Sequence, residues 1–155
     1  MTIPNEINEI IQKIVGIRLD DINLACEMMM FSFGEYELHS QCLTRIIRNN
    51  DVLVTTRDYQ NWDEKVDTNN DEWYFVNKYK GDITGGTVLS LELSTLGDIK
   101  ILLDNGTRIE LYISNGHSYH YGEENEQWVF FKLHDFSHPF VSVYQGAAAI
   151  REYVE

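Results

Sequence analysis

Apolar and polar positions alternate with a period of two along much of the chain, as in strands that face a core on one side. One such stretch, residues 36–48, is followed by Asn49-Asn50-Asp51. Asparagine and aspartate tolerate the positive φ values that tight turns need. Residues 52–56 are rich in β-branched side chains, so the pattern predicts a hairpin that turns at Asn49 and Asn50.

A two-residue loop at this turn sets three cross-strand pairs: Arg48 with Asp51, Arg45 with Val54, and Gln41 with Asp58. The register gathers four polar side chains on one face of the ribbon: His39, Gln41, Arg45 and Asp58. A loop that begins one residue later would bring in Arg57, because a slip of one residue reverses every side chain.

This polar cluster has two interpretations. In a small enzyme, His39 would act as a base, Arg45 would bind an anion and Asp58 would orient either one. In a structural role, Arg45 pairs with a carboxylate that fixes the strand register, while His39 and Gln41 are satisfied locally. We favour the structural role, since no nucleophile motif accompanies the cluster.

Helical spacing is found in short stretches. Four isoleucines, at positions 7, 10, 11 and 14, form one apolar stripe, with Asn5 as the expected N-cap and Gly16 as the expected end. Asn70 is placed to cap a second helix that closes at Gly81. Residues 147–154 suggest a short C-terminal helix.

The remaining apolar segments predict strands at residues 17–24, 25–33, 87–95, 99–103, 108–114, 126–133 and 139–144. Residues 25–33 are nearly continuously apolar, which indicates a central strand covered on both faces. Asn105-Gly106 predicts a hairpin that pairs Lys100 with Leu111 and Leu102 with Ile109. We expect a single α+β domain over residues 1–155, with a large, mainly antiparallel, curved sheet, the N-terminal helix packed on it, and one or two further short helices.

Charge narrows the choice of partner. Twenty-five acidic residues against twelve basic ones give a net charge of −13, which argues against nucleic acid and anionic membranes as partners. A basic protein or a cation suits this charge better. Residues 58–72 are the most acidic stretch, and they read either as a solvated loop or as a docking arm with an aromatic anchor. The predicted partner-binding residues are Trp62, Asp63, Glu64, Asp67, Asp71 and Glu72.

The cysteines and histidines predict no metal or cofactor. Cys26 and Cys42 form no CxxC pair and are expected to be buried free thiols. The spacings of His117 with His120 and of His134 with His138 could chelate zinc, but structural zinc sites normally recruit cysteine. The N-terminus has no signal-peptide core and no apolar run is long enough to cross a bilayer, so we expect a cytoplasmic protein.

Several segments together resemble an uncharacterised bacterial family. They are Met28-x-x-Phe31-x-Phe33-Gly34, Leu38-His39-x-Gln41-Cys42-x-x-Arg45-Ile46, Arg57-Asp58, Glu126-Gln127-Trp128-x-Phe130 and His138-x-Phe140-Val141. The chain departs from the family at Leu43-Thr44, where Pro-Trp is common. The resemblance implies a small intracellular module without an assigned reaction. In size and acidity the chain is also similar to immunity proteins that neutralise bacterial toxins.

The favoured function is therefore a non-catalytic, acidic protein-binding module, an immunity protein that would occlude the cleft of a toxin, for example a nuclease. The alternatives are a small enzyme that uses the polar cluster and a structural or homo-oligomer-forming domain.

Overall fold

The computed structural model describes residues 4–114, 126–135 and 137–151. Its helices are α1 (Asn5–Ile11), η1 (Gln12–Ile14), η2 (Thr56–Asn61) and α2 (Asp71–Ile83). Its strands are β1 (Leu19–Ala25), β2 (Met28–Phe33), β3 (Tyr36–Ser40), β4 (Leu43–Arg48), β5 (Asp51–Thr55), β6 (Val88–Leu93), β7 (Ile99–Leu103), β8 (Thr107–Tyr112), β9 (Glu126–Lys132), β10 (Phe140–Tyr144) and β11 (Ala147–Arg151). The α+β class predicted from the sequence is confirmed.

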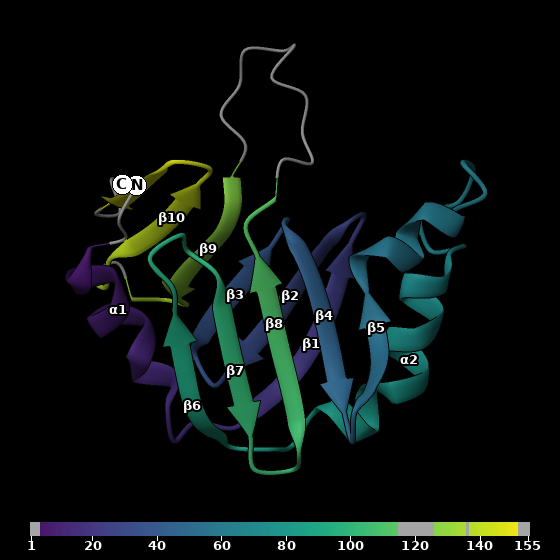
Figure 1. Cartoon of the computed structure of the whole chain (residues 1–155), viewed down its shortest axis with the longest axis horizontal. Coiled ribbons are helices and arrows are strands. Elements are labelled where there is room, and N and C mark those ends of the chain that lie inside the picture. Colours follow the sequence, from purple (N-terminus) through teal and green to yellow (C-terminus); the bar gives the residue numbers. More distant parts are fainter. Residues whose placement is uncertain (1–3, 115–125, 136, 152–155) are drawn as a thin grey trace.

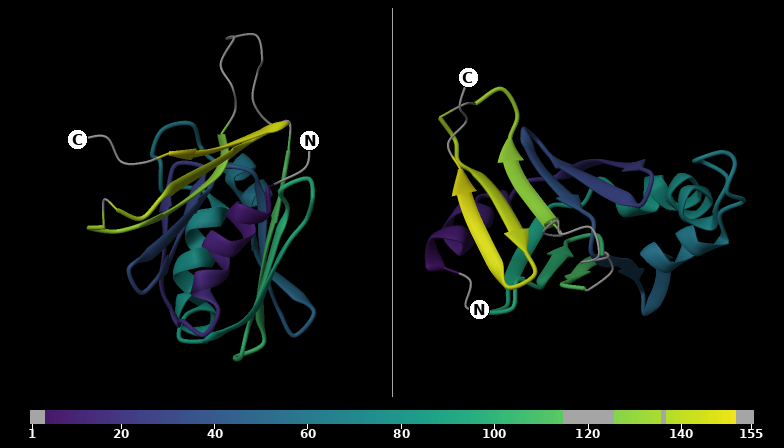
Figure 2. Two further views of the ribbon diagram at one scale, coloured as in Figure 1. Left: turned by 90° about the vertical axis from the view of Figure 1, so that its left-hand side faces the viewer. Right: turned by 90° about the horizontal axis from the view of Figure 1, so that it is seen from above.

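Within these residues the strands form two antiparallel sheets that lie one behind the other (Figure 1). The six-stranded sheet has the order β1-β2-β3-β9-β10-β11, and the five-stranded sheet has the order β5-β4-β8-β7-β6. The six-stranded sheet is strongly twisted, so that β10 and β11 cross over one end of the molecule (Figure 2). The alternating pattern predicted one large sheet, whereas the strands are divided between two.

The two sheets enclose a single hydrophobic core. A line of paired residues crosses the inner face of the six-stranded sheet and is buried throughout: Ile22, Phe31, Leu38, Phe130 and Val141. A matching line crosses the five-stranded sheet: Ile46, Ile109, Ile101 and Leu91. The period-two alternation of the sequence thus directs one face of each sheet to the other.

The helices close opposite open edges of this two-sheet stack (Figures 1 and 2). The isoleucine stripe of α1 and η1 is buried as predicted, and Gln12 Nε2 donates to the Leu91 carbonyl of edge strand β6 at 2.7 Å. Pro4, not Asn5, is the N-cap of α1, which has no side-chain cap. At the other edge α2 contacts β1 and β5, the edge strands of the two sheets.

The predicted strand at residues 36–48 is wrong as a single element. It breaks at Gln41 and Cys42, whose backbone amides both donate to the Gln127 carbonyl, at 2.8 and 3.1 Å. The chain leaves the six-stranded sheet there and enters the five-stranded one, so β3 and β4 belong to different sheets. Side chains before and after the break therefore cannot share a face of one ribbon.

Both predicted hairpins form, with shifted registers. Arg48 pairs with Asp51 as expected, but a bulge between Ile46 and Ile47 places Arg45 opposite Thr55. At the second hairpin Lys100 pairs with Glu110 and Leu102 with Arg108. Gly106, at φ +84°, ends a three-residue turn that begins at Asp104, where the prediction used two residues.

Two further predictions are wrong. Residues 147–151 form strand β11, not a helix, and pair with β10 from Ala147 opposite Tyr144 onward. The apolar segment at 25–33 is split by a turn at Cys26 and Glu27, and Met28 and Met30 remain half-exposed on the outer face of β2. That strand is therefore fully covered on one face only.

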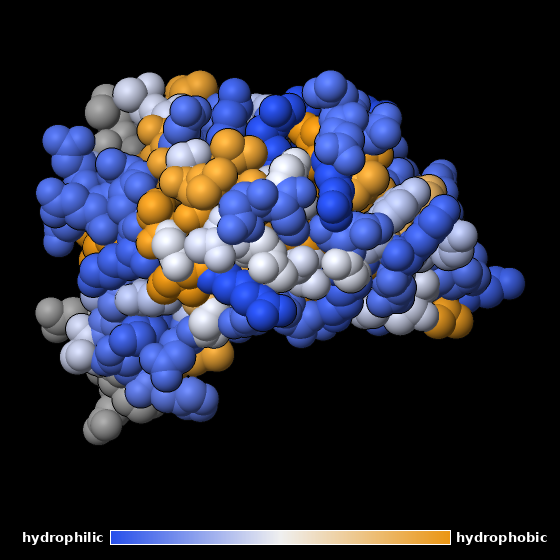
Figure 3. Space-filling model, turned by 90° about the horizontal axis from the view of Figure 1, so that it is seen from below, coloured by the Kyte–Doolittle hydropathy of each residue, from blue (hydrophilic) through white to orange (hydrophobic). Residues whose placement is uncertain are grey.

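The face of the molecule seen from below is largely hydrophilic (Figure 3). On this face, apolar side chains form several groups separated by hydrophilic ones. Exposed apolar side chains are scattered along the chain: Val15 follows η1, Val66 is in the segment between η2 and α2, and Leu89 is on β6. Among the described residues, no helix is both long enough and apolar enough to cross a membrane.

Candidate functional site

Residues 56–70, which we call the acidic arm, connect β5 to α2 and begin with η2. The arm starts in a capping box: the Thr55 side chain accepts from the backbone of η2, and Asp58 Oδ2 accepts from the Thr55 amide at 3.1 Å. Asp58 thus serves the local backbone. It does not lie in a shared cluster with the other predicted polar residues.

An aromatic pair forms the middle of the acidic arm. Tyr59 and Trp62 stack with their ring centroids 5.7 Å apart, and Trp62 Nε1 donates to the Val66 carbonyl at 2.7 Å. Trp62 is half-buried. The predicted anchor is therefore fixed in place with part of its surface accessible.

Asp63 organises the rest of the acidic arm. Its Oδ1 accepts from the amides of Lys65 and Val66 at 2.9 and 3.1 Å, and its Oδ2 accepts from Asn69 Nδ2 at 2.5 Å. These bonds, that of Asn69 first, hold the pKa of Asp63 below its usual value. Asp63 is an internal tether, and it leaves Glu64 and Asp67 exposed on the loop.

The arm ends where α2 begins. Asn70 caps this helix as predicted, accepting from the Trp73 amide at 3.0 Å. Asp71 accepts from Asn61 Nδ2 at 2.7 Å and ties the start of the helix to the end of η2. The arm is therefore held at both ends and in its middle.

Glu72 is not on the surface, contrary to its predicted role in partner binding. It is 0% exposed, and neither carboxyl oxygen has a hydrogen-bond partner within the described structure. Desolvation raises the pKa of Glu72 to about 9, and the negative charges of Asp58 and Glu27 act in the same direction. Glu72 is accordingly protonated at neutral pH and contributes no charge to a partner.

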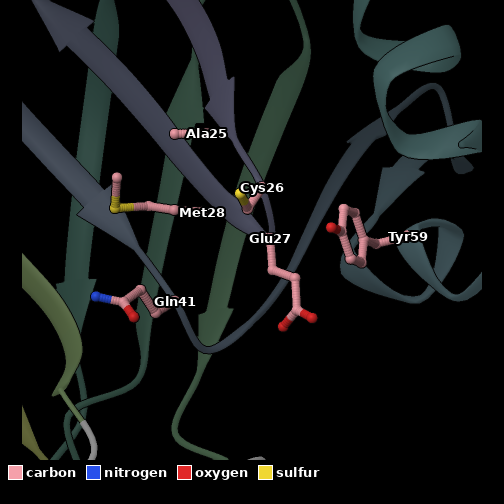
Figure 4. Close-up of a pocket in the computed structure, with 6 residues that line it drawn as sticks. All are labelled: Ala25, Cys26, Glu27, Met28, Gln41 and Tyr59. Carbon is pink, nitrogen blue, oxygen red and sulfur yellow. The ribbon is translucent and has the colours of Figure 1, made fainter. Parts of the chain in front are cut away.

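Beside the acidic arm lies an open pocket of about 390 Å³, lined by Ala25, Cys26, Glu27, Met28, Gln41 and Tyr59. Figure 4 shows Glu27 and Tyr59 on one side and Met28 and Gln41 on the other, with the Tyr59 hydroxyl directed toward the β1–β2 turn. We call this the β1–β2 pocket. It combines a carboxylate, a phenol and an amide with apolar walls, which is the usual make-up of a ligand site.

The prediction that Cys26 is buried is wrong, because Cys26 lies in the turn that forms one wall of the pocket. This residue has φ +53° and is exposed, whereas Cys42 is 1% exposed. Burial raises the pKa of the Cys42 thiol to about 11. The two thiols should therefore differ sharply in reactivity, because the thiolate is the nucleophile.

We expect Ellman's reagent to titrate one thiol per native chain at about pH 8, and two after denaturation in guanidinium chloride. Cys42 should react at least roughly 100-fold more slowly than Cys26 in the native protein, since its raised pKa and its burial both oppose attack. Cys26→Ser should abolish the fast reaction and Cys42→Ser should leave it intact. Two fast thiols in the native protein would contradict the burial of Cys42.

The four residues of the predicted polar cluster are dispersed. His39 Nε2 lies 3.4 Å from Glu37 on the outer face of β3, and Gln41 lines the β1–β2 pocket. Arg45 Nε donates to Glu110 at 2.5 Å on the outer face of the other sheet. Asp58 caps η2. The catalytic interpretation thus has no common pocket for its residues, and an Arg45–carboxylate pair is present with Glu110 as the partner.

Of the two predicted histidine pairs, the structure describes only His134 and His138. His117 and His120 lie outside the described residues. His138 is buried, with Nδ1 3.0 Å from the Pro139 carbonyl and Nε2 3.4 Å from Lys13 Nζ, and burial lowers its pKa. His134 is exposed with φ +58°. Across the part of the chain that the structure describes, no group of three histidine, cysteine or carboxylate side chains is arranged to hold a metal ion.

Sequence reasoning missed Glu27, Met28 and Tyr59 as neighbours. Glu27 lies in a turn that the continuous apolar pattern concealed, and Met28 follows it. Tyr59 reaches them from a segment about thirty residues away in the chain. The usable signal was the Cys26-Glu27 pair, whose polar carboxylate interrupts the apolar run.

Comparisons with protein-family models, curated proteins and solved structures found no match to this chain.

Proposed function

We propose that this protein is a non-catalytic, acidic binding module for a basic protein, and that it acts in the cytoplasm as an immunity protein that occludes the cleft of a toxin. The observation that carries the proposal is the acidic arm. Its backbone is fixed by Asp63, Asn70 and the Thr55 capping box, while Glu64 and Asp67 stay exposed.

A fixed, charged loop suits fast association. The loop is already ordered before binding, so it loses little conformational entropy when the complex forms. Within the described structure, neither Glu64 nor Asp67 forms an ion pair, so no salt bridge must break first. Negative charge at this edge would steer a basic partner toward the exposed part of Trp62.

The similarity to immunity proteins in size and acidity, with a net charge of −13, supports the proposed immunity role. Toxins that act on nucleic acids present cationic clefts to phosphate, and an acidic surface can fill such a cleft. The direct test is to express the product of each adjacent gene in a bacterial host, with and without this chain. Growth arrest that this chain relieves, together with a complex of the two purified proteins, supports immunity. A toxic neighbour whose effect persists in the presence of this chain contradicts it.

The double variant Glu64→Gln/Asp67→Asn should slow association with that partner by about tenfold and flatten the dependence of the association rate on salt. The dissociation rate should change little, because exposed charges at a rim act mainly on encounter. Stopped-flow intrinsic tryptophan fluorescence of the mixed proteins, recorded at several ionic strengths, measures the association rate.

The matched control is Glu6→Gln/Glu9→Gln on α1, at the opposite edge of the molecule (Figure 1). It removes the same two negative charges from exposed positions, so it corrects for the loss of net charge. Equal association rates for the arm variant and the α1 variant would remove the acidic arm from the interface.

A further inference from the structure

The β1–β2 pocket has one carboxylate that nothing in the described structure neutralises. Glu27 is exposed and forms no ion pair there. The opposite wall supplies the Met28 thioether and the Gln41 side-chain amide, and the Tyr59 hydroxyl points in from η2. Among the described residues, the Gln41 side chain makes only a long contact, in which Nε2 donates to Glu126 Oε1 at 3.5 Å.

Negative charge gathers around this space from several elements. Partial burial raises the pKa of Tyr59, and the negative charges of Glu27 and Asp67 act in the same direction. Glu27 is on the β1–β2 turn and Asp67 is on the acidic arm. Asp58 and Glu27 act likewise on Glu72, whose buried oxygens have no partner among the described residues. A cation is the ligand that this region lacks.

Resting on the function proposed above, we infer that the β1–β2 pocket receives one arginine side chain of the basic partner. Its guanidinium group would donate a pair of hydrogen bonds to Glu27 and further bonds to the Tyr59 hydroxyl and the Gln41 carbonyl oxygen. Its methylene stem would lie along Met28 and Ala25. The acidic arm would then guide the partner, and this pocket would fix its position.

Arginine fits these walls better than lysine. Guanidinium is planar, presents five donors and pairs with a carboxylate through two parallel bonds, whereas an ammonium is a compact and strongly hydrated charge. The pocket holds three separate acceptor side chains. The five donors of a guanidinium are spread over three nitrogens, whereas the three donors of an ammonium leave a single nitrogen, so guanidinium can reach acceptors that lie further apart. The pocket is also open to solvent on one side, which suits a tethered side chain more than a free ligand that must be mostly enclosed.

The test uses N-acetyl-arginine-N-methylamide as the probe, with the corresponding citrulline and lysine compounds as comparisons, in amide NMR titrations of the full chain. Citrulline has nearly the shape of arginine and no charge. We expect saturable shifts at residues 25–28, 41 and 59 with arginine, at least fivefold weaker binding with lysine, and no saturable shifts with citrulline. Glu27→Gln should weaken arginine binding at least fivefold, and Glu9→Gln on α1 should leave it unchanged.

The inference is overturned if citrulline gives the same shifts, if arginine shifts are unsaturable or lie elsewhere on the acidic surface, or if Glu27→Gln binds like Glu9→Gln. Glu27 is exposed in a turn, so its amide variant should keep the fold, and the unchanged remainder of the NMR spectrum verifies this. These results are separable from the proposed function. Loss of the pocket with retained toxin neutralisation would reject only the arginine contact, whereas arginine binding without neutralisation of any adjacent product would reject the immunity role.

Discussion

Replacing Trp128 with alanine is expected to lower the free energy of unfolding by about 3–5 kcal/mol, a large part of the stability of an ordinary domain. Trp128 is 0% exposed on β9. Its Nε1 donates at 2.8 Å to the carbonyl of Gly97, in the turn between β6 and β7 of the other sheet. The substitution would therefore leave a cavity between the sheets and an unsatisfied carbonyl group.

Trp128→Phe separates the two contributions. It keeps most of the buried ring but removes the donor to Gly97, so we expect a loss of about 1–3 kcal/mol. Trp62→Phe is the matched control, because it removes an equally short bond, to Val66, from a half-buried position on the acidic arm; its loss should stay within about 1 kcal/mol. Urea unfolding followed by circular dichroism measures all three variants. A Trp128→Phe loss no larger than that of Trp62→Phe would show that the link between the sheets adds little.

The sequence predicted well those elements whose signals are local. The isoleucine stripe of α1 depends only on spacing, and the Asn70 cap depends only on one side chain and the amide three residues later. The division of strands between two sheets was not predictable in this way. Alternation continues on both sides of Gln41 and Cys42, and only the pairing of both amides with the distant Gln127 carbonyl shows that the chain changes sheets there.

The candidate site shows the same limit. Composition located the acidic arm, but it could not distinguish carboxylates that tether the backbone, such as Asp63, from exposed ones such as Glu64. The burial of Glu72 did have a signal. Val76 and Ile83 lie four and eleven residues after Glu72, a spacing that puts all three on one face of α2. All three are buried. Reading that stripe as the docking face would have removed Glu72 from the predicted surface.

Glu72→Gln should stabilise the protein by about 2–4 kcal/mol near pH 7.5 and by little near pH 5. The pKa of Glu72 rises from an ordinary 4.5 in the unfolded chain to about 9 on burial, so folding takes up a proton in between. Its contribution to stability is therefore complete below pH ~4.5 and is lost progressively as the pH rises toward ~9. Glutamine is neutral at every pH and removes that loss while keeping the shape of the side chain.

Urea unfolding of wild type and Glu72→Gln at several pH values between about 5 and 8.5 measures the difference. The difference between the two proteins cancels the pH-dependent contributions to stability that they share. These include the contributions of Asp21, Asp63 and Asp135, whose pKa values are lowered, so that they are lost only at acidic pH. The matched control, Glu64→Gln, makes the same chemical change at an exposed position and should stay within about 0.5 kcal/mol of wild type throughout. If Glu72→Gln also tracks wild type across this range, Glu72 ionises normally in the folded protein. That result would return a negative charge to the start of α2, next to the acidic arm.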